Sequence, residues 1–115
     1  MGRLSELIVK LWYRARGYRV RDCNWRTRGG ELDLILCKEH QIVFVEVRGR
    51  RGSGLVSPLD SFDLRKQYYF ERCAVYYLHR HGLVAANARL DFAGVTWVGL
   101  CPRIQVIEDV RRFEC

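Results

Sequence analysis

Apolar and polar positions recur along this 115-residue chain with two different periods, and each period predicts one kind of element. Near the N-terminus, the apolar residues that fall at helical spacing on one face are Leu4, Leu7, Ile8, Leu11 and Trp12. Ser5 is suited to cap a helix, and Gly17 is suited to end one. We therefore expect a first helix from Ser5 to about Arg16.

A period of two residues follows, and it predicts three consecutive strands. Residues 18–25 alternate, the sequence Arg26-Thr-Arg-Gly-Gly is a turn, and residues 31–37 and 42–48 have the composition of two further strands. The short connection at 39–41 predicts that these last two strands form an antiparallel hairpin. Residues 42–48 are β-branched and nearly all apolar, which is typical of a central strand covered on both faces of a sheet.

The second half of the chain is expected to hold one long helix and two more strands. A loop rich in glycine and arginine occupies residues 50–58, and the helix begins at Ser57-Pro58, or at a later cap such as Ser61, and ends at Gly82. The expected buried stripe of this helix is Leu64, Tyr68, Cys73, Tyr76 and Tyr77. The aromatic residues that we interpret as packing residues, rather than as base-stacking residues, are Tyr68, Tyr69, Phe70, Tyr76 and Tyr77.

Strands at residues 89–98 and 103–107 complete the order α-β-β-β-α-β-β. This order predicts an α/β fold in which a mixed β-sheet is flanked by helices. A chain of 115 residues has room for one hydrophobic core, and neither a linker nor a repeat divides it. We therefore expect residues 1–115 to form a single domain.

The most informative polar residue is Glu46, which stands between Val45 and Val47 in the apolar strand. A carboxylate buried alone is costly or takes up a proton, so such a group is usually paired with a cation or bound to a metal. Asp33 has a similar apolar setting in the preceding strand, and Glu31 projects from the same face. If the two strands pair, these carboxylates converge, and such oxygen ligands suit Mg²⁺ or Mn²⁺.

A second interpretation of the same acids requires no metal. Glu46 would pair with Arg48 or with another arginine, and Asp33 would lie in a turn or at a strand edge. Asp91 repeats the pattern of an acid inside an apolar strand, and we interpret it as a structural partner of Arg89 or of another arginine.

The charge of the chain favours a polyanionic partner. Twenty lysines and arginines against thirteen acids give a net charge of +7, and most of the basic residues are arginines, which suit bidentate contact with phosphate. Arg48, Arg50 and Arg51 stand beside a glycine-rich loop, where they could contact a nucleic-acid backbone. The alternatives are a mildly basic protein whose charge serves solubility and an ordinary polar loop.

The cysteines and the apolar runs bear on location. The five cysteines are Cys23, Cys37, Cys73, Cys101 and Cys115. Their spacing is wide, no C-x-x-C pair is present, and no secretory signal is evident, so we expect buried, reduced thiols. The apolar runs are too short to span a bilayer, and we expect a cytoplasmic protein with no membrane association.

Several of these segments, taken together, resemble a known family. Gly30-Glu-Leu-Asp-Leu-Ile, Val43-Phe-Val-Glu-Val-Arg, Lys66 and Arg89-Leu-Asp-Phe resemble the YraN family. That family is assigned to the restriction-endonuclease-like, PD-(D/E)xK nuclease superfamily and is similar to archaeal Holliday-junction resolvases. The likeness extends over nearly the whole chain, because Glu6 and the pair Gly17-Tyr18 also fit.

The resemblance implies a metal-dependent endonuclease that hydrolyses phosphodiester bonds of branched or structured DNA, such as junctions or flaps. It implies that Asp33 and Glu46 hold Mg²⁺ or Mn²⁺ and that Glu6 completes the ligand set. It further implies that Arg48 takes the place of the motif lysine, and that Glu31 belongs to the catalytic site. Two-fold symmetric homodimers are common among junction-cutting nucleases, so a homodimer is expected on the same ground.

The arginine at the motif position leaves the function open. Arginine cannot be deprotonated at accessible pH, so Arg48 can stabilise phosphate charge but cannot act as a general base. Lys66 is a candidate to reach the site from the second helix, and the alternative is that it is a solvated helix residue. A second function is therefore a non-catalytic nucleic-acid-binding module that retains the nuclease fold. A third is an interaction protein whose acids form only internal salt bridges.

Overall fold

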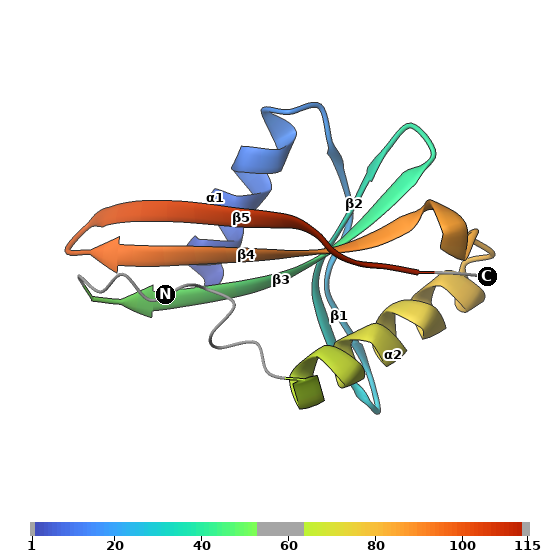
Figure 1. The fold of residues 1–115 in the computed structure, drawn as a ribbon. Helices are drawn as coiled ribbons and strands as arrows, with labels where there is room; N and C mark the ends of the chain where they lie inside the picture. The colour runs from blue at the N-terminus through green and yellow to red at the C-terminus, as the bar shows by residue number, and fades with distance from the viewer. Residues whose placement is uncertain (1, 53–63, 114–115) are drawn as a thin grey trace.

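The computed structural model describes residues 2–52 and 64–113, which form two α-helices, a short 3₁₀ helix and five strands. Their order is α1 (Gly2–Arg14), β1 (Arg19–Thr27), β2 (Gly30–Lys38), β3 (Gln41–Arg51), α2 (Leu64–Arg80), η2 (Ala85–Asn87), β4 (Ala88–Val98) and β5 (Cys101–Arg112) (Figure 1). The predicted order of helices and strands is confirmed. Most of the loop predicted at residues 50–58, the proposed caps of α2 and the side chain of Leu64 lie outside the described residues.

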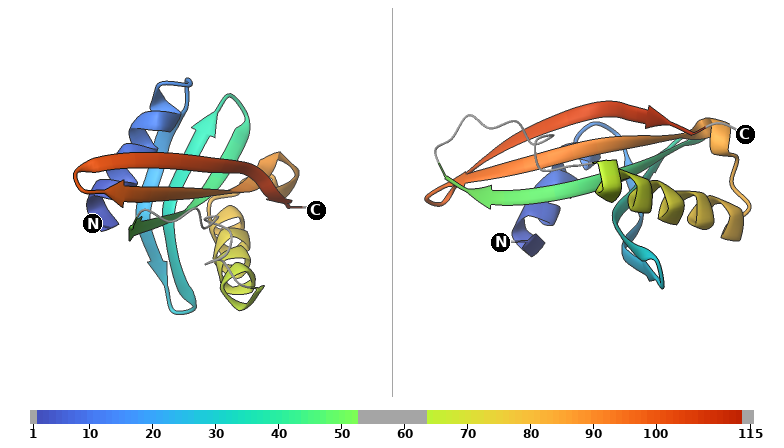
Figure 2. Two further views of the ribbon diagram at one scale, coloured as in Figure 1. Left: turned by 60° about the vertical axis from the view of Figure 1, so that its left-hand side comes forward. Right: turned by 60° about the horizontal axis from the view of Figure 1, so that its bottom comes forward.

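The strands form one mixed sheet in the order β1-β2-β3-β4-β5. The pair β3 and β4 is parallel, and the other neighbouring strands are antiparallel. A parallel pair needs a long crossover, and the connection that carries α2 provides it. The β1–β2 hairpin is turned steeply against the β4–β5 hairpin, so the sheet is strongly twisted (Figure 2).

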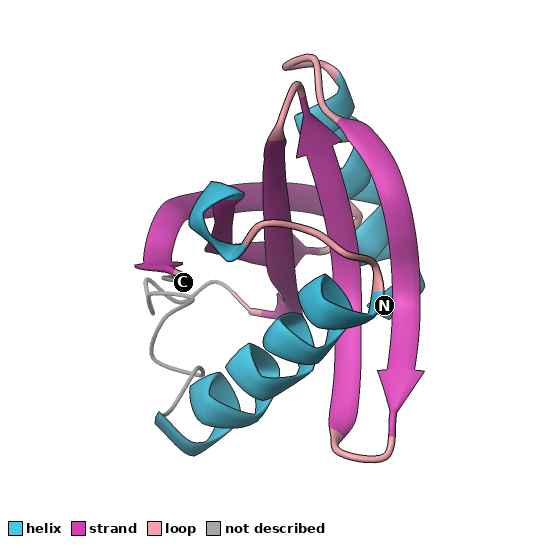
Figure 3. Cartoon of the chain, turned by 90° about the vertical axis from the view of Figure 1, so that its right-hand side faces the viewer, coloured by secondary structure: helices cyan, strands magenta, loops and turns pink. Residues whose placement is uncertain are grey.

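Two apolar layers lie on opposite faces of the sheet. One contains Val9 and Tyr13 of α1, and the other contains Phe70 and Tyr77 of α2. Successive side chains of β3 alternate between the layers, with Phe44 in the α2 layer and its two neighbours in the α1 layer. Figure 3 shows α2 lying diagonally across one face with α1 behind the strands. The prediction that residues 42–48 are covered on both faces is therefore confirmed.

The face of α1 that packs on the sheet differs from the apolar stripe in the sequence. The leucines of that stripe that are exposed are Leu4, Leu7 and Leu11. The helix is buried instead through Ser5, Val9 and Tyr13. The Ser5 hydroxyl accepts a hydrogen bond of 3.0 Å from Trp97 Nε1, and the Tyr13 hydroxyl donates one of 2.6 Å to Asp91. The predicted stripe is thus wrong for these three leucines, whereas Ile8 and Trp12 are partly buried against the α1 layer. Hydrophobicity alone does not reveal the partners on β4 that bury Ser5 and Tyr13.

The predicted buried stripe of α2 is correct for Cys73 and Tyr77 and wrong for Tyr68 and Tyr76. These two tyrosines are 55% and 51% exposed, and Tyr69 is 49% exposed. The buried positions of the helix are Phe70, Cys73, Ala74, Tyr77 and Leu78. They follow the three-and-four spacing of a helix face against a sheet, which places the three exposed tyrosines outside the core. The prediction that the aromatic residues of α2 pack in the core is therefore wrong for these three.

The cysteines in the described part of the chain are unpaired thiols. They are Cys23, Cys37, Cys73 and Cys101, and Cys115 lies outside the described residues. The expected reduced state agrees with this finding, but burial holds fully only for Cys73, since Cys23 and Cys101 are exposed. Neither described helix is long and apolar enough to cross a membrane.

Asp91 lies fully buried in β4 at the centre of a hydrogen-bond network. Arg89 donates to both of its carboxylate oxygens, from Nε at 2.9 Å and from Nη2 at 3.1 Å. The Tyr13 hydroxyl and the backbone N–H of Asp109 donate at 2.6 and 2.8 Å, and Arg89 also donates to the Tyr18 hydroxyl at 3.0 Å. The structural pairing of Asp91 with Arg89 is thus confirmed, and the network joins α1, the connection between α1 and β1, β4 and β5.

The Tyr13 hydroxyl is the link between α1 and this network, so its removal should destabilise the fold. We expect Tyr13→Phe to lower the free energy of unfolding by about 1–3 kcal/mol, because a buried carboxylate loses a donor. Urea denaturation followed by circular dichroism measures the change. Tyr68→Phe, at an exposed tyrosine, is the matched control and should change the free energy of unfolding by less than about 0.5 kcal/mol. Equal values for the two variants would contradict this role of Tyr13.

Candidate active site

The candidate site lies where β2 separates from β3. The two strands pair from the hairpin turn as far as Leu34 and Val45. One residue further on, Asp33 makes no backbone pair with β3, and its carboxylate oxygen Oδ2 accepts a hydrogen bond of 3.0 Å from the backbone N–H of Val47. The side chain of Asp33 therefore takes the place of a strand partner, and the divergence of the strands leaves room for side chains between them.

A cavity of about 290 Å³ occupies this place. The residues that line it are Gly30, Glu31, Asp33, Glu46, Arg48, Lys66, Tyr69 and Phe70. They come from β2, β3 and the first turns of α2, so the crossover helix closes the gap that the two strands leave open. All five residues that the sequence and the resemblance indicated as catalytic thus line one cavity, although their catalytic role stays a prediction.

Glu46 and Asp33 form a buried pair of carboxyl groups. Glu46 is only 7% exposed. Its burial, together with the nearby Asp33 carboxylate, raises the pKa of Glu46 to about 8. Burial also raises the pKa of Asp33, the negative charge of Glu31 adds to this effect, and the hydrogen bond from Val47 opposes it. Burial therefore opposes two negative charges on this pair and favours a protonated Glu46 at neutral pH.

Arg48 is the cation closest to the pair. Its Nη2 lies 2.9 Å from Glu46 Oε1, so the ion pair foreseen in the metal-free interpretation is present. This ion pair does not satisfy Arg48, because its Nε–H is buried without a hydrogen-bond partner among the described residues. A buried donor without a partner is uncommon, and it suits an incoming anionic oxygen.

Glu6 lies beside the cavity and does not line it. Burial, the charge of Asp33 and that of Glu31 raise the pKa of the Glu6 carboxyl, and a hydrogen bond with Asn24 opposes them. Within residues 2–52 and 64–113, no three acidic, histidine or cysteine side chains are grouped closely enough to hold a metal ion. Glu6 therefore adds negative charge near Asp33, and its role as a third ligand stays a prediction.

The residues of the cavity nevertheless fit a divalent cation. Mg²⁺ is commonly held by one or two carboxylates and completes its coordination with water and substrate phosphate. Asp33 and Glu46 supply hard oxygen donors in one cavity, and Arg48 and Lys66 beside them suit the phosphate that would accompany a cation.

The remaining predicted residues lie around the rim. Lys66 lines the cavity from α2 and is exposed, so its role in the site stays a prediction. Arg50 and Arg51 continue β3 beyond the cavity, paired with Thr96 and Trp97 of β4, and are exposed. They do not line the cavity, so their contact with nucleic acid stays a prediction.

Comparison with known sequences places the chain among related proteins. The model of Uncharacterised protein family UPF0102 matches residues 5–107. The chain belongs to this family. The resemblance to the YraN family is thereby confirmed, since UPF0102 is the same family.

Similar proteins of the UPF0102 family occur in distant bacteria. A UPF0102 protein of Marinobacter nauticus is 38% identical over 96 residues, which cover 84% of this chain and 78% of that protein. One of Thermotoga maritima is 39% identical over 96 residues, covering 84% and 85%, respectively. One of Moorella thermoacetica is 32% identical over 110 residues, covering 96% and 91%. These matches establish the family, and their names state no activity.

Three residues of the cavity, Gly30, Tyr69 and Phe70, were not foreseen as site residues. Tyr69 follows Lys66 by three positions, so the two share a face of α2, and helical spacing from Lys66 would have pointed to it. Gly30 has a φ of +155°, and a Cβ at this position would lie 3.0 Å from Cys73 Sγ. The absence of a side chain thus lets β2 begin close against α2 beside the acids.

The pKa of Glu46 makes stability depend on pH in a defined direction. The folded-state pKa of about 8 lies above the ordinary value of 4.5, so the folded state binds the extra proton between these values. This contribution to stability is complete below about pH 4.5 and is lost as the pH rises through about 8. Asp33 acts in the same direction.

We therefore expect Glu46→Gln to gain stability relative to the unmodified protein between about pH 5 and pH 9, measured by urea denaturation in EDTA. Each tenfold difference in proton affinity between the folded and unfolded states corresponds to about 1.4 kcal/mol. Glu39→Gln, which removes an exposed acid at the β2–β3 turn, is the matched control and should show no such trend. A difference between Glu46→Gln and the unmodified protein that stays constant with pH would contradict the assignment.

Proposed function

We propose that this protein is a Mg²⁺- or Mn²⁺-dependent endonuclease that hydrolyses phosphodiester bonds of branched or structured DNA. The observation that carries the proposal is the pair Asp33 and Glu46, which meet in a cavity that also presents two cations, Arg48 and Lys66. Carboxylates held this close suit a cation, and the arginine and lysine suit the phosphate that would accompany it.

Each residue of the cavity has a chemical role in this proposal. Asp33 and Glu46 would hold the metal, which would polarise the phosphoryl oxygen and help to deprotonate the attacking water. Arg48, with its unpartnered Nε–H, would donate to a phosphate oxygen and stabilise the negative charge that develops there. Lys66 would contact the phosphate or orient the water from α2. Glu31, exposed at the rim, would hold solvent beside the reacting group.

Several features support DNA as the partner. The net charge of +7 attracts a polyanion, and Arg50 and Arg51 extend the cationic strand end beyond Arg48. The choice of branched DNA and the expected homodimer derive from the likeness of the YraN family to junction resolvases. A DNA substrate agrees with the cytoplasmic location that the sequence predicts.

Cleavage of labelled junction, flap and duplex DNA with Mn²⁺ tests the enzyme directly. We expect Asp33→Asn and Glu46→Gln to lower the rate at least about a hundredfold, because each removes a charged oxygen ligand. Arg48→Ala should lower it about a hundredfold or more through the loss of charge stabilisation. Glu39→Gln is the matched control and should retain the full rate. Cleavage that persists in both Asp33→Asn and Glu46→Gln would refute the proposed site.

A second function is favoured by the contact between Arg48 and Glu46. Because Arg48 Nη2 already holds Glu46 Oε1, the protein could bind nucleic acid as a non-catalytic module. That function requires salt-sensitive DNA binding that survives Glu46→Gln, and no metal-dependent cleavage. Metal-dependent cleavage that is lost in Asp33→Asn would decide against it.

A further inference from the structure

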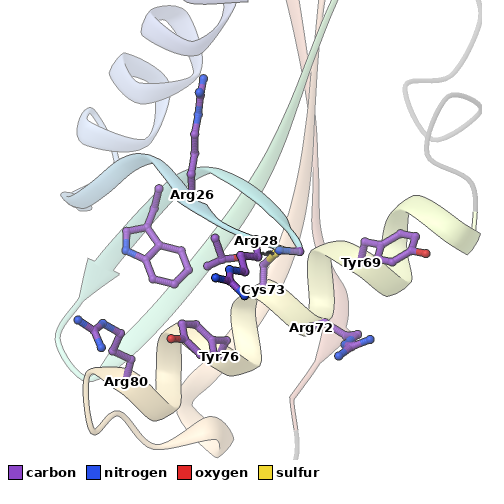
Figure 4. A pocket seen from close by; sticks show the side chains of 10 residues that line it. Arg26, Arg28, Tyr69, Arg72, Cys73, Tyr76 and Arg80 are labelled. Carbon is purple, nitrogen blue, oxygen red and sulfur yellow. Dashed lines mark hydrogen bonds between the residues drawn. The ribbon is translucent and has the colours of Figure 1, made fainter.

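A second hollow adjoins the carboxylate cavity, between the turn of the β1–β2 hairpin and α2. It is a groove of about 690 Å³, within the range of about 300–1,000 Å³ that is usual for ligand sites. Tyr69 lines both the groove and the cavity, and Gly29 of the groove precedes Gly30 of the cavity. The groove therefore leads directly to Asp33 and Glu46. Figure 4 shows it from close by.

One wall of the groove presents aromatic rings that the core leaves uncovered. Tyr69 and Tyr76 lie on the same side of α2 and are about half exposed, while Trp25 is half-buried at the end of β1. The rings of Trp25 and Tyr76 are 5.9 Å apart between centroids and are tilted by 35°. Half-exposed, neighbouring rings of this kind provide flat apolar faces on which a base can stack.

The same groove carries positive charge and, among its lining residues, no acid. Four arginines line it, from the β1–β2 turn and from α2, namely Arg26, Arg28, Arg72 and Arg80. Arg26 approaches Glu31 only to 3.7 Å, and both side chains are exposed. No ion pair holds Arg28 or Arg80 within the described part of the chain. Figure 4 places Arg28 beside Cys73, facing α2, and Arg80 beside Tyr76.

The exposed rings and the arginines of the groove together suit one kind of ligand, a nucleic-acid strand with unpaired bases. In a duplex the faces of the bases are stacked on one another, so exposed tyrosines can stack only on bases of an unpaired strand. Arginines beside the rings can neutralise the phosphates of that strand. From Tyr69 to Arg80 the helix rises by roughly 16 Å, so the groove has room for more than a single base.

We propose that this groove binds an unpaired strand of DNA and leads it to the carboxylate cavity. The inference deepens the proposed function, because it names the substrate as DNA with a single-stranded segment, such as a flap. It is tested by binding in EDTA, where cleavage plays no part. Failure of the groove and failure of the nuclease can therefore be told apart.

The first test measures fluorescence anisotropy with a labelled oligothymidylate of about ten nucleotides and the full chain in EDTA. We expect Tyr76→Ala to weaken binding about tenfold through the loss of stacking, and Tyr76→Phe, which keeps the ring, to bind as the unmodified protein does. Tyr68→Ala is the matched control, because Tyr68 is an equally exposed tyrosine of α2 that does not line the groove. It should change the affinity by less than about twofold. Urea denaturation checks that Tyr76→Ala remains folded.

The second test measures the salt dependence of the same binding. Arg28→Ala and Arg80→Ala should each reduce the slope of log affinity against log salt by about 0.7, as expected for one lost contact with a single-stranded phosphate. Arg103→Ala is the matched control, since Arg103 lies at the start of β5, beside the β4–β5 turn that Figure 1 shows far from α2. Its slope should equal that of the unmodified protein.

Several outcomes would overturn the proposal. Duplex DNA bound as tightly as the oligothymidylate would do so, as would equal losses in Tyr68→Ala and Tyr76→Ala. Tighter binding of an oligouridylate would overturn the assignment to DNA. If Tyr76→Ala leaves binding unchanged while Asp33→Asn abolishes cleavage, the groove fails and the nuclease stands. If the groove binds as expected and no substrate is cleaved, the nuclease fails and the groove stands.

Discussion

The parallel pair of β3 and β4 carries two carboxylates into the apolar centre of the sheet, and each requires partners there. Asp91 on β4 receives its partners from within the fold: two contacts from Arg89, one from Tyr13 and one from a backbone N–H. Glu46 on β3 has fewer partners, namely an ion pair with Arg48 and a side-chain hydrogen bond with Asp33. Both acids stand between apolar residues of a strand. Asp91 is fully hydrogen-bonded within the fold and has a structural role, whereas Glu46 has fewer partners and faces a cavity that a ligand could enter.

The availability of Glu46 follows from the geometry of the strands. If β2 continued to pair with β3 beyond Leu34, the register would set Asp33 opposite Glu46, and a backbone carbonyl would satisfy the Val47 N–H. The separation of the strands instead lets the Asp33 carboxylate accept from Val47 beside Glu46 and exposes both acids to a cavity. The parallel crossover then places α2, with Lys66 and Tyr69, over the opening. The acids and the cations of the cavity are thus products of one irregularity in the sheet.

Those features of the fold and the site that depend on local sequence pattern could be predicted from the sequence. The order of elements, the hairpin of β2 and β3, and the unusual positions of Asp33 and Glu46 could all be inferred from periodicity and from the cost of charge in apolar strands. The buried face of α1 could not, because Ser5 and Tyr13 are buried by partners on β4 at separations of 92 and 78 residues. Hydrophobicity favours Leu4, Leu7 and Leu11, and it contains no information about such distant partners.

The aromatic residues of α2 show the same limit and have a functional consequence. Tyr76 and Tyr77 are adjacent and chemically identical, but Tyr77 is buried and donates to Asp22, whereas Tyr76 faces the groove. Only the rotation of the helix on the sheet, set by the residues that fit beneath it, decides which tyrosine is left for a ligand. That rotation also directs Tyr69 toward both the groove and the carboxylate cavity.

The packing of α2 on the sheet therefore determines both the shape of the groove and the position of the groove beside Asp33 and Glu46. Arg48 cannot serve as a general base, so the protein has less intrinsic proton-transfer chemistry than a site with lysine in its place. Positioning of the substrate can compensate for this, because a strand held near its reacting geometry crosses a lower barrier. Stacking on Tyr69 and Tyr76 would fix the strand along α2, and the unpartnered Nε–H of Arg48 would fix the phosphate at its end. In such an arrangement, stacking on the tyrosines would determine both the preference for an unpaired strand and the rate of cleavage. A duplex without a free strand could not stack on these rings, so its phosphate would not be held in place.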